Sequence, residues 1–195
     1  SEGNEIDGDM VEAVCAIDLK QRGLLAGDTA VSTVMANLGL THALRDAGIN
    51  LIQTKVGDRY VLEAMREGGY VIGGEQSGHT IFLEHNSTGD GLVTALQFLA
   101  ACKRAGKSAG EAAKTMTRFP QTLINVRVKD KHAADGNQAI ADAVAAAEAA
   151  LGEDGRVLLR PSGTEPVVRV MVEAMDEQAA EQHAKAIAEV VEREI

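Results

Sequence analysis

A glycine-rich polar run, GGEQSGH at residues 73–79, constrains the fold of this chain more than any other segment. Short apolar stretches flank it, which is typical of a tight turn between two strands, with glycines that keep the backbone thin. Glu75, Ser77 and His79 place a carboxylate, a hydroxyl and an imidazole at alternate positions. This compact set of hydrogen-bonding groups suits a ligand with many hydroxyls, such as a sugar. The alternative is a strand-end turn whose polar residues only satisfy the backbone.

A second loop, RPSGTEP at residues 160–166, lies between two segments, 156–159 and 167–172, whose composition favours strands. The residues that could bind a phosphate group there are Arg160, Ser162, Gly163, Thr164 and Arg169. Arginine forks match phosphate oxygens, and a glycine lets a backbone N–H approach a ligand closely. The alternative is a polar hairpin loop in which Arg160 pairs with Glu165. A sugar-binding turn together with a phosphate-binding loop indicates a phosphorylated sugar as the ligand.

The two loops, in this order and at this separation, resemble the sugar-binding and phosphate-binding loops of the α-D-phosphohexomutases. Within that superfamily they are most similar to the bacterial phosphoglucosamine mutase branch. Gln76 and the Lys-Val-Gly-Asp-Arg-Tyr run at residues 55–60 favour that branch, and the stretches at 33–37 and 87–91 agree with it. The resemblance covers essentially the whole chain.

This resemblance implies that the chain is the substrate-binding half of an intramolecular phosphotransferase of the isomerase class. The implied reaction interconverts glucosamine 6-phosphate and glucosamine 1-phosphate through a phosphoserine and a bisphosphorylated sugar. It would supply UDP-N-acetylglucosamine and cell-wall precursors. Two alternatives stay open: a fragment of a phosphomannomutase or phosphoglucomutase, and a free-standing phosphosugar-binding module.

The resemblance also implies roles for the first loop. Glu75 and Ser77 would hydrogen-bond the sugar hydroxyls, while the second loop holds the phosphate that is not reacting. His79 is a candidate general acid or base, because an imidazole can accept and release protons near neutral pH. The alternative for His79 is a structural histidine that orders the turn.

Lys55 and Arg59 flank a predicted strand-to-helix turn, where the helix N-terminal amides favour anions. We expect Arg59, and less directly Lys55, to face the bound phosphosugar. The alternative is a solvated surface pair with Asp58.

Family members carry two further domains, which hold a phosphorylated serine and an Asp-Gly-Asp-Gly-Asp-Arg loop that binds magnesium. Neither motif occurs in this chain, because Asp7 and Asp9 lack the third aspartate and the arginine. The apolar pattern that follows them predicts a helix cap instead. We therefore expect domains 3 and 4 alone, with magnesium in the full-length enzyme, none bound here, and no activity without the missing serine. The expected partners are a hexosamine phosphate and the missing domains 1 and 2, and a homodimer stays open.

The net charge of −10 argues against nucleic acids and anionic membranes as partners, since both require a basic surface. Cys15 and Cys102 lie in apolar helical patterns and are expected to be buried free thiols, as in a reducing cytoplasm. No apolar stretch approaches the ~20 residues that span a bilayer. The remaining histidines lack metal-ligand spacing and predict no metal site: His42, His85, His132 and His183.

Strands and helices alternate as far as residue 118, which predicts a three-layer α/β/α domain with a mixed, mostly parallel sheet. The last strand, after the tight turn, should run antiparallel to the strand before it. Phe119 and Pro120 mark a boundary, because proline disfavours helix in the preceding residue. Residues 119–195 follow the order β-α-β-β-α, which predicts a smaller α+β domain with an antiparallel sheet and helices on one face. We expect domains at 1–118 and 119–195, with a hinge near residues 118–121.

Three element bounds are specific enough to compare with the structure. We expect a strand at residues 70–72, a helix from Asp90 through Ala101, and a shorter helix from Ser108 to about Thr117.

Overall fold

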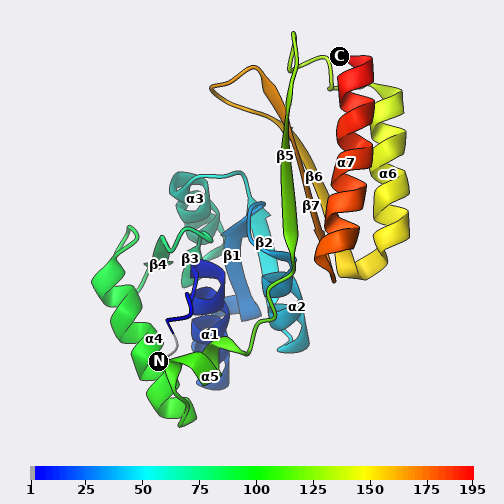
Figure 1. Ribbon diagram of the computed structural model, residues 1–195. Coiled ribbons are helices and arrows are strands. Elements are labelled where there is room, and N and C mark those ends of the chain that lie inside the picture. The colour runs from blue at the N-terminus through cyan, green and yellow to red at the C-terminus, as the bar shows by residue number, and fades with distance from the viewer. Residues whose placement is uncertain (1–2) are drawn as a thin grey trace. The chain divides into compact units, whose positions relative to one another are not determined.

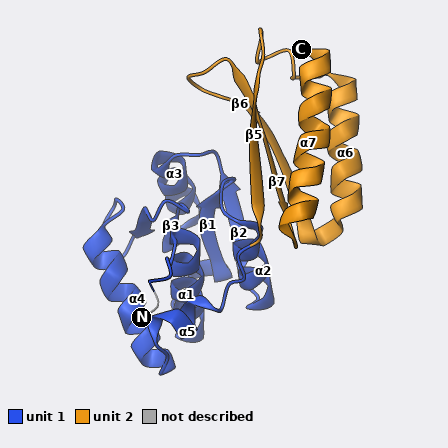
Figure 2. Ribbon diagram, in the orientation of Figure 1, with its two compact units in different colours: residues 1–118 blue, residues 119–195 orange. Residues whose placement is uncertain are grey.

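The computed structural model describes residues 3–195. The chain divides into two compact units, residues 1–118 and 119–195, which Figure 2 shows in different colours. No helix among residues 3–195 is long and apolar enough to cross a membrane.

The first unit contains one four-stranded sheet. Its strands are β1 (Thr29–Thr33), β2 (Asn50–Thr54), β3 (Ile72–Gly74) and β4 (Thr80–Phe82), in the spatial order β2-β1-β3-β4. β1 pairs in parallel with both β2 and β3, and β4 runs antiparallel to β3. The predicted mixed, mostly parallel sheet with an antiparallel final strand is therefore confirmed.

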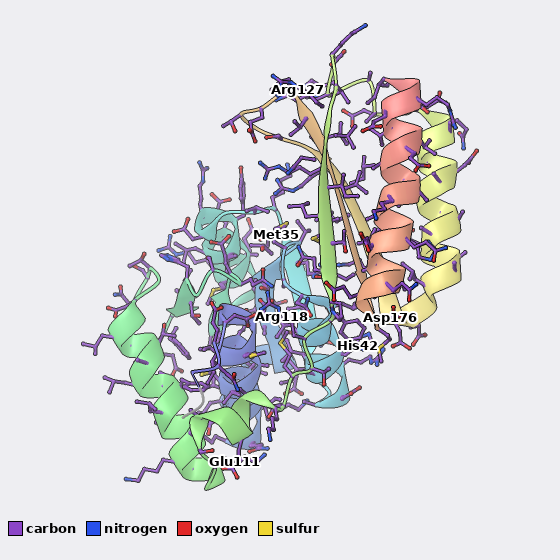
Figure 3. All side chains as sticks on the ribbon, viewed as in Figure 1. Met35, His42, Glu111, Arg118, Arg127 and Asp176 are labelled. Carbon is purple, nitrogen blue, oxygen red and sulfur yellow. The ribbon has the colours of Figure 1, made fainter. Side chains whose placement is uncertain are left out.

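The described residues of this unit also form five α-helices (Figure 1): α1 (Gly8–Gln21), α2 (Leu38–Asp46), α3 (Asp58–Gly68), α4 (Gly91–Ala105) and α5 (Ala109–Ala113), with a 3₁₀ turn, η1 (Ala26–Asp28), before β1. Four of the helices begin with a side chain that caps backbone amides, from Asp7, Asn37, Asp90 and Ser108. Ser108 forms a reciprocal capping box with Glu111, which is labelled in Figure 3. Helix α3 instead begins at Gly57 without a side-chain cap.

Helices cover both faces of the sheet, and every residue of β1, β3 and β4 is therefore buried. Ala30 and Ile72 face a core shared with α1, α2, α4 and α5. Val31 and Ile81 face the other way, into a smaller core with Val61 of α3. The predicted three-layer α/β/α arrangement is confirmed.

Three bounds differ from the sequence prediction. The strand expected at residues 70–72 lies at Ile72–Gly74, α4 continues to Ala105, and α5 ends at Ala113. Gly73 can lie within β3 because it is a glycine: a Cβ there would come within 2.8 Å of both Met65 and Val61. The sheet and α3 therefore pack closely at this position.

The second unit has the order β5 (Gln121–Arg127), α6 (Gln138–Leu151), η2 (Gly152–Asp154), β6 (Gly155–Pro161), β7 (Val167–Ala174) and α7 (Glu177–Glu194). The three strands form an antiparallel sheet in the order β5-β7-β6. α6 and α7 lie side by side on one face of it (Figure 1). The predicted β-α-β-β-α order, the antiparallel sheet and the one-sided helices are all confirmed.

Alternate residues of β7 point into the core of this unit. Val168, Val170 and Val172 are fully buried and pack against Ile187 and Val191 of α7. Asp176, labelled in Figure 3, caps α7 by accepting a hydrogen bond from the Ala179 N–H. The opposite face of β7 includes Glu173, which is also fully buried.

Candidate functional site

The first loop is a closed turn between β3 and β4. The Gly78 N–H donates to the Glu75 carbonyl at 2.9 Å, and the Glu75 N–H donates to the His79 carbonyl at 3.1 Å. Gly78 has a φ of 94°, a conformation that favours glycine. Ser77 is exposed at the tip of the turn, while Glu75 and His79 are partly buried.

Hydrogen bonds from two other elements hold this turn in place. The Gly8 N–H, at the start of α1, donates to the Gln76 carbonyl at 3.0 Å. A Cβ on Gly8 would lie only 2.2 Å from the Glu75 carbonyl oxygen, so a larger residue cannot fit without displacing the turn. The Ser32 hydroxyl, in β1, donates to the Gly74 carbonyl at 3.0 Å. The position of the turn is therefore determined by contacts that are far apart in the sequence.

The Glu75 side chain contacts the start of α3. Its Oε1 accepts a hydrogen bond from the Gly57 N–H at 3.0 Å. This bond supplies a partner for an N-terminal amide of a helix that has no side-chain cap of its own. One carboxylate oxygen of Glu75 is thus committed within the protein.

Asp58 and Gly89 adjoin His79, and the sequence analysis did not assign either of them to the site. The His79 Nε2 lies 3.4 Å from the Asp58 Oδ2. A Cβ on Gly89 would lie 2.5 Å from the imidazole ring, so the ring rests directly against this glycine. The stretch 87–91 carries part of the family resemblance, and that was the available signal for Gly89.

Lys55 and Arg59 are both exposed, and they do not form the predicted alternative pair with Asp58. The Arg59 Nε donates to Glu63 Oε1 at 2.8 Å, one helical turn along α3, while Asp58 faces His79. The predicted alternative, a surface pair with Asp58, is therefore wrong about the carboxylate that Arg59 contacts.

Helix α1, whose first turn contacts the loop, carries two acidic side chains with 0% exposure. They are Asp9 and Glu12. Asp9 Oδ2 accepts a hydrogen bond from the Asn37 N–H at 2.8 Å. Burial, and then the negative charge of Asp9, raise the pKa of Glu12 well above its ordinary value. Glu12 Oε2 would lie 3.3 Å from a Cβ on Gly74, so this carboxyl group lies directly behind the turn between β3 and β4.

The second loop joins β6 to β7, and Ser162 is its buried centre, with 2% exposure. The Ser162 N–H donates to the Val167 carbonyl at 2.9 Å, and the Ser162 hydroxyl accepts from the Glu165 N–H at 3.2 Å. Gly163 and Thr164 are exposed at the tip. The loop is thus closed by its own serine, with two successive exposed residues between its fixed ends.

Two arginines lie at the base of this loop. Arg160 and Arg169 are register partners on β6 and β7. Burial, and then the positive charge of Arg169, lower the pKa of Arg160. Two guanidinium groups on adjacent strands make a local positive potential, which favours an anion.

Arg169, rather than Arg160, contacts the acidic residue of the loop. Its Nη2 lies 3.3 Å from Glu165 Oε2 and 3.5 Å from Ser162 Oγ. The predicted alternative, in which Arg160 pairs with Glu165, is therefore wrong about the partner.

Lys131 is a further cation beside this loop that the sequence analysis did not identify. Its Nζ donates to the Ser162 carbonyl at 2.6 Å and to the Gly163 carbonyl at 3.3 Å. Lys131 and Thr164 line a groove of about 380 Å³ on this side of the loop. No sequence signal could have found this contact, because it joins residues about 30 positions apart.

Magnesium, which the family resemblance implies, does not fit the donor groups that residues 3–195 present. No group of three or more potential metal-ligating side chains occurs among them. Asp7 Oδ1 accepts from the Met10 N–H and caps α1, and Asp7 Oδ2 lies 3.7 Å from Arg118 Nη1. The carboxylates of the Asp7–Asp9 segment are thus engaged in holding the fold together.

The sequence matches two domains of one family, whose descriptions are "Phosphoglucomutase/phosphomannomutase, alpha/beta/alpha domain III" over residues 7–119 and "C-terminal domain" over residues 123–190. The chain belongs to the phosphoglucomutase/phosphomannomutase family. Among named members of this family, the phosphoglucosamine mutase of Frankia alni is 58% identical over 189 residues, which are 97% of this chain and 42% of that protein. The phosphoglucosamine mutase of Thermobifida fusca is 54% identical over 195 residues, or 100% of this chain and 43% of that protein. The chain thus spans less than half the length of these family members.

Two solved structures share the fold of this chain. The N-acetylphosphoglucosamine mutase of Aspergillus fumigatus, in complex with GlcNAc-6P and magnesium, matches 97% of this chain and 48% of its own with a TM-score of 0.81 at 21% identity. A phosphoglucomutase/phosphomannomutase family protein from Burkholderia thailandensis matches 98% of this chain and 43% of its own, with a TM-score of 0.75 at 22% identity.

Proposed function

We propose that this chain is the substrate-binding half of a phosphoglucosamine mutase, with residues 1–118 as its third domain and 119–195 as its fourth. The whole protein would interconvert glucosamine 6-phosphate and glucosamine 1-phosphate in the cytoplasm. The observation that carries the proposal is the combination of a polar turn held rigidly on one unit with a closed loop between two arginines on the other. High identity to named phosphoglucosamine mutases supports this choice of sugar over glucose or mannose.

In this proposal the first loop binds the sugar ring. Glu75 presents its second carboxylate oxygen to a sugar hydroxyl, since Oε1 is occupied by the Gly57 N–H. Ser77 is exposed at the tip of the turn and can donate or accept another hydrogen bond. A ligand held by a few hydroxyl contacts can be released and bound again in the opposite orientation, as a reaction through a bisphosphorylated sugar requires.

The second loop, in this proposal, binds the phosphate that is not reacting. Arg160 and Arg169 supply charge and planar donors, while Gly163 and Thr164 offer exposed backbone amides and a hydroxyl. The buried Ser162 hydroxyl is already held by the Glu165 N–H, so we assign it to shaping the loop as well as to phosphate binding. A phosphate site without sugar contacts accepts the 1-phosphate and the 6-phosphate equally.

His79 is the proposed proton-transfer group for the sugar hydroxyl that gains or loses the phosphoryl group. Asp58 orients its ring through the 3.4 Å contact at Nε2. Lys55 and Arg59 add positive charge near the start of α3. The serine that carries the phosphoryl group and the magnesium ligands would come from other domains, so we expect this chain alone to bind phosphosugars weakly and not to catalyse.

Isothermal titration calorimetry of the 195-residue chain tests the proposal. Glucosamine 6-phosphate should bind more tightly than glucose 6-phosphate, and glucose 6-phosphate more tightly than inorganic phosphate. Ser77→Ala should weaken the two sugar phosphates and leave inorganic phosphate unchanged, while Arg160→Met should weaken all three. Glu67→Gln, on the exposed surface of α3, is the control. Equal binding of all three ligands would contradict a sugar-binding role for this chain.

A further inference from the structure

Lys131 is the one cation that bonds directly to the backbone of the phosphate loop in the described part of the chain. Its Nζ donates to two successive carbonyls, those of Ser162 and Gly163. Lys131 follows β5 by four residues, so it reaches the loop from a separate segment of the second unit.

The contact of Lys131 with these two carbonyls also determines where the following N–H groups point. In a trans peptide the C=O of one residue and the N–H of the next point in opposite directions. Because the Ser162 and Gly163 carbonyls point toward Lys131, the N–H groups of Gly163 and Thr164 point away from it. Two successive amides that share a direction make a concave site for an anion.

The hydrogen bonds around the loop agree with such a site. The amides on either side are used within the loop: Ser162 N–H donates to Val167 O, and Glu165 N–H donates to Ser162 Oγ. Within residues 3–195, the Gly163 and Thr164 N–H groups donate to no protein acceptor. Both residues are exposed, so these amides are accessible to a ligand.

We propose that Lys131 is a positioning residue for phosphate binding: it clamps the Ser162 and Gly163 carbonyls and thereby orients the Gly163 and Thr164 amides toward the phosphate. This inference rests on the proposed function of the loop as a phosphate site. It assigns Lys131 a role through the backbone rather than through direct contact with the ligand. The ammonium group acts from the side of the peptides opposite to the bound anion.

Lys129 provides a matched control. It carries the same charge two residues away and lines the same groove, and it is exposed. Its ammonium forms no hydrogen bond or ion pair within the described residues. Lys129→Met therefore removes the same charge without removing a clamp, and Lys131→Arg keeps donors that can bridge two carbonyls.

The test is an NMR titration of the 195-residue chain with inorganic phosphate, in the wild type and the three variants. We expect Lys131→Met to weaken phosphate binding about tenfold, Lys129→Met to weaken it less than about threefold, and Lys131→Arg to restore most of the affinity. In the absence of phosphate, Lys131→Met should already shift the Gly163 and Thr164 amide resonances, and Lys129→Met should not.

The two readouts separate failure of the clamp from failure of the phosphate site. If Lys131→Met and Lys129→Met weaken binding equally and neither shifts the free amides, the clamp is overturned and the phosphate site stands. If wild-type Gly163 and Thr164 do not respond to phosphate, the proposed function of the loop is overturned. In that case, shifted Gly163 and Thr164 amide resonances in phosphate-free Lys131→Met would still show that Lys131 orients the loop, without a role in phosphate binding. Unchanged binding and unchanged amide shifts in Lys131→Met would overturn both parts of the inference.

Discussion

The Glu75 carboxylate accepts a hydrogen bond from the Gly57 N–H at 3.0 Å, and this bond joins the turn between β3 and β4 to the start of α3. Asp58, the next residue, contacts His79 at the other end of the same turn. One hydrogen bond, to Glu75, and one close contact, with His79, thus connect the start of α3 to the two ends of the 75–79 segment. The arrangement fixes the direction in which Glu75 and His79 face before any ligand binds, which reduces the entropy lost on binding.

Replacement of Glu75 by alanine should loosen the start of α3 as well as the turn. It removes the side-chain acceptor of the Gly57 amide, and we expect the free energy of unfolding to fall by about 1 kcal/mol. Hydrogen exchange at Gly57 should become faster, while exchange in the second unit stays unchanged. Glu67→Ala, an exposed residue of α3, should change neither quantity. An unchanged exchange rate at Gly57 would show that the bond does not persist in solution.

His79→Gln in the proposed full-length enzyme should lower turnover about 100-fold, the range for loss of general acid–base catalysis. Binding of glucosamine 6-phosphate should change less than about threefold, because glutamine is similar to histidine in size and is also polar. Steady-state kinetics combined with calorimetry separates the two effects. A variant that turns over as fast as the wild type would assign His79 to ordering the turn alone.

Glu12→Gln should make the chain more resistant to alkaline pH. Burial, and then the charge of Asp9, raise the folded-state pKa of Glu12 above the ordinary value of 4.5 that applies in the unfolded chain. Above that ordinary value the folded state binds the proton more tightly, so stability falls as pH rises, by up to about 1.4 kcal/mol per pH unit, until the folded pKa is passed. Glutamine carries no charge at any pH and removes this loss.

Urea denaturation at several pH values checks this expectation. The stability of Glu12→Gln relative to the wild type should increase from pH 5 upward, whereas Glu67→Gln, which is exposed, should run parallel to the wild type. Parallel curves for Glu12→Gln and the wild type would mean that Glu12 is ionised in the folded protein.

Glu173→Ala should destabilise the second unit strongly. Glu173 is fully buried on the central strand β7, and its Oε2 lies 3.0 Å from Arg156 Nη2 on β6. Removal of Glu173 takes this carboxylate away from the Arg156 guanidinium. Loss of one partner of a buried ion pair costs about 3–5 kcal/mol. Glu177→Ala, in the first turn of α7, is an exposed control. Thermal unfolding followed by circular dichroism measures the difference, and equal midpoints for the two variants would contradict it.

The sequence predicted much of the fold because periodicity and caps act locally. Asp7, Asp90 and Ser108 all cap helices near the expected starts, and the valines of β7 alternate as the sheet requires. The bounds were wrong where packing overrides local preference. Gly73 extends β3 because a strand without a Cβ can approach Met65 and Val61.

Only the two loop motifs of the candidate site could be predicted from the sequence. Their roles in ligand binding remain proposals. The contacts that hold those motifs come from residues distant in the sequence, such as Gly8 and Ser32 for the first loop and Lys131 for the second. A single sequence gives no measure of which of its many glycines and lysines will meet a given loop. The sequence also did not predict which neighbouring carboxylate each arginine contacts. Arg59 pairs with Glu63, and Arg169 pairs with Glu165.

The most direct test of the central claim is an NMR titration of the 195-residue chain with glucosamine 6-phosphate, with glucose 6-phosphate and inorganic phosphate as controls. The account predicts amide shifts at Glu75 and Ser77 as well as at Arg160, Ser162 and Thr164, with larger shifts at the first loop for the amino sugar. Shifts confined to residues 160–166, and equal for all three ligands, would contradict it. Such a result would leave a phosphate site only, and sugar selection would have to come from elsewhere in the whole protein.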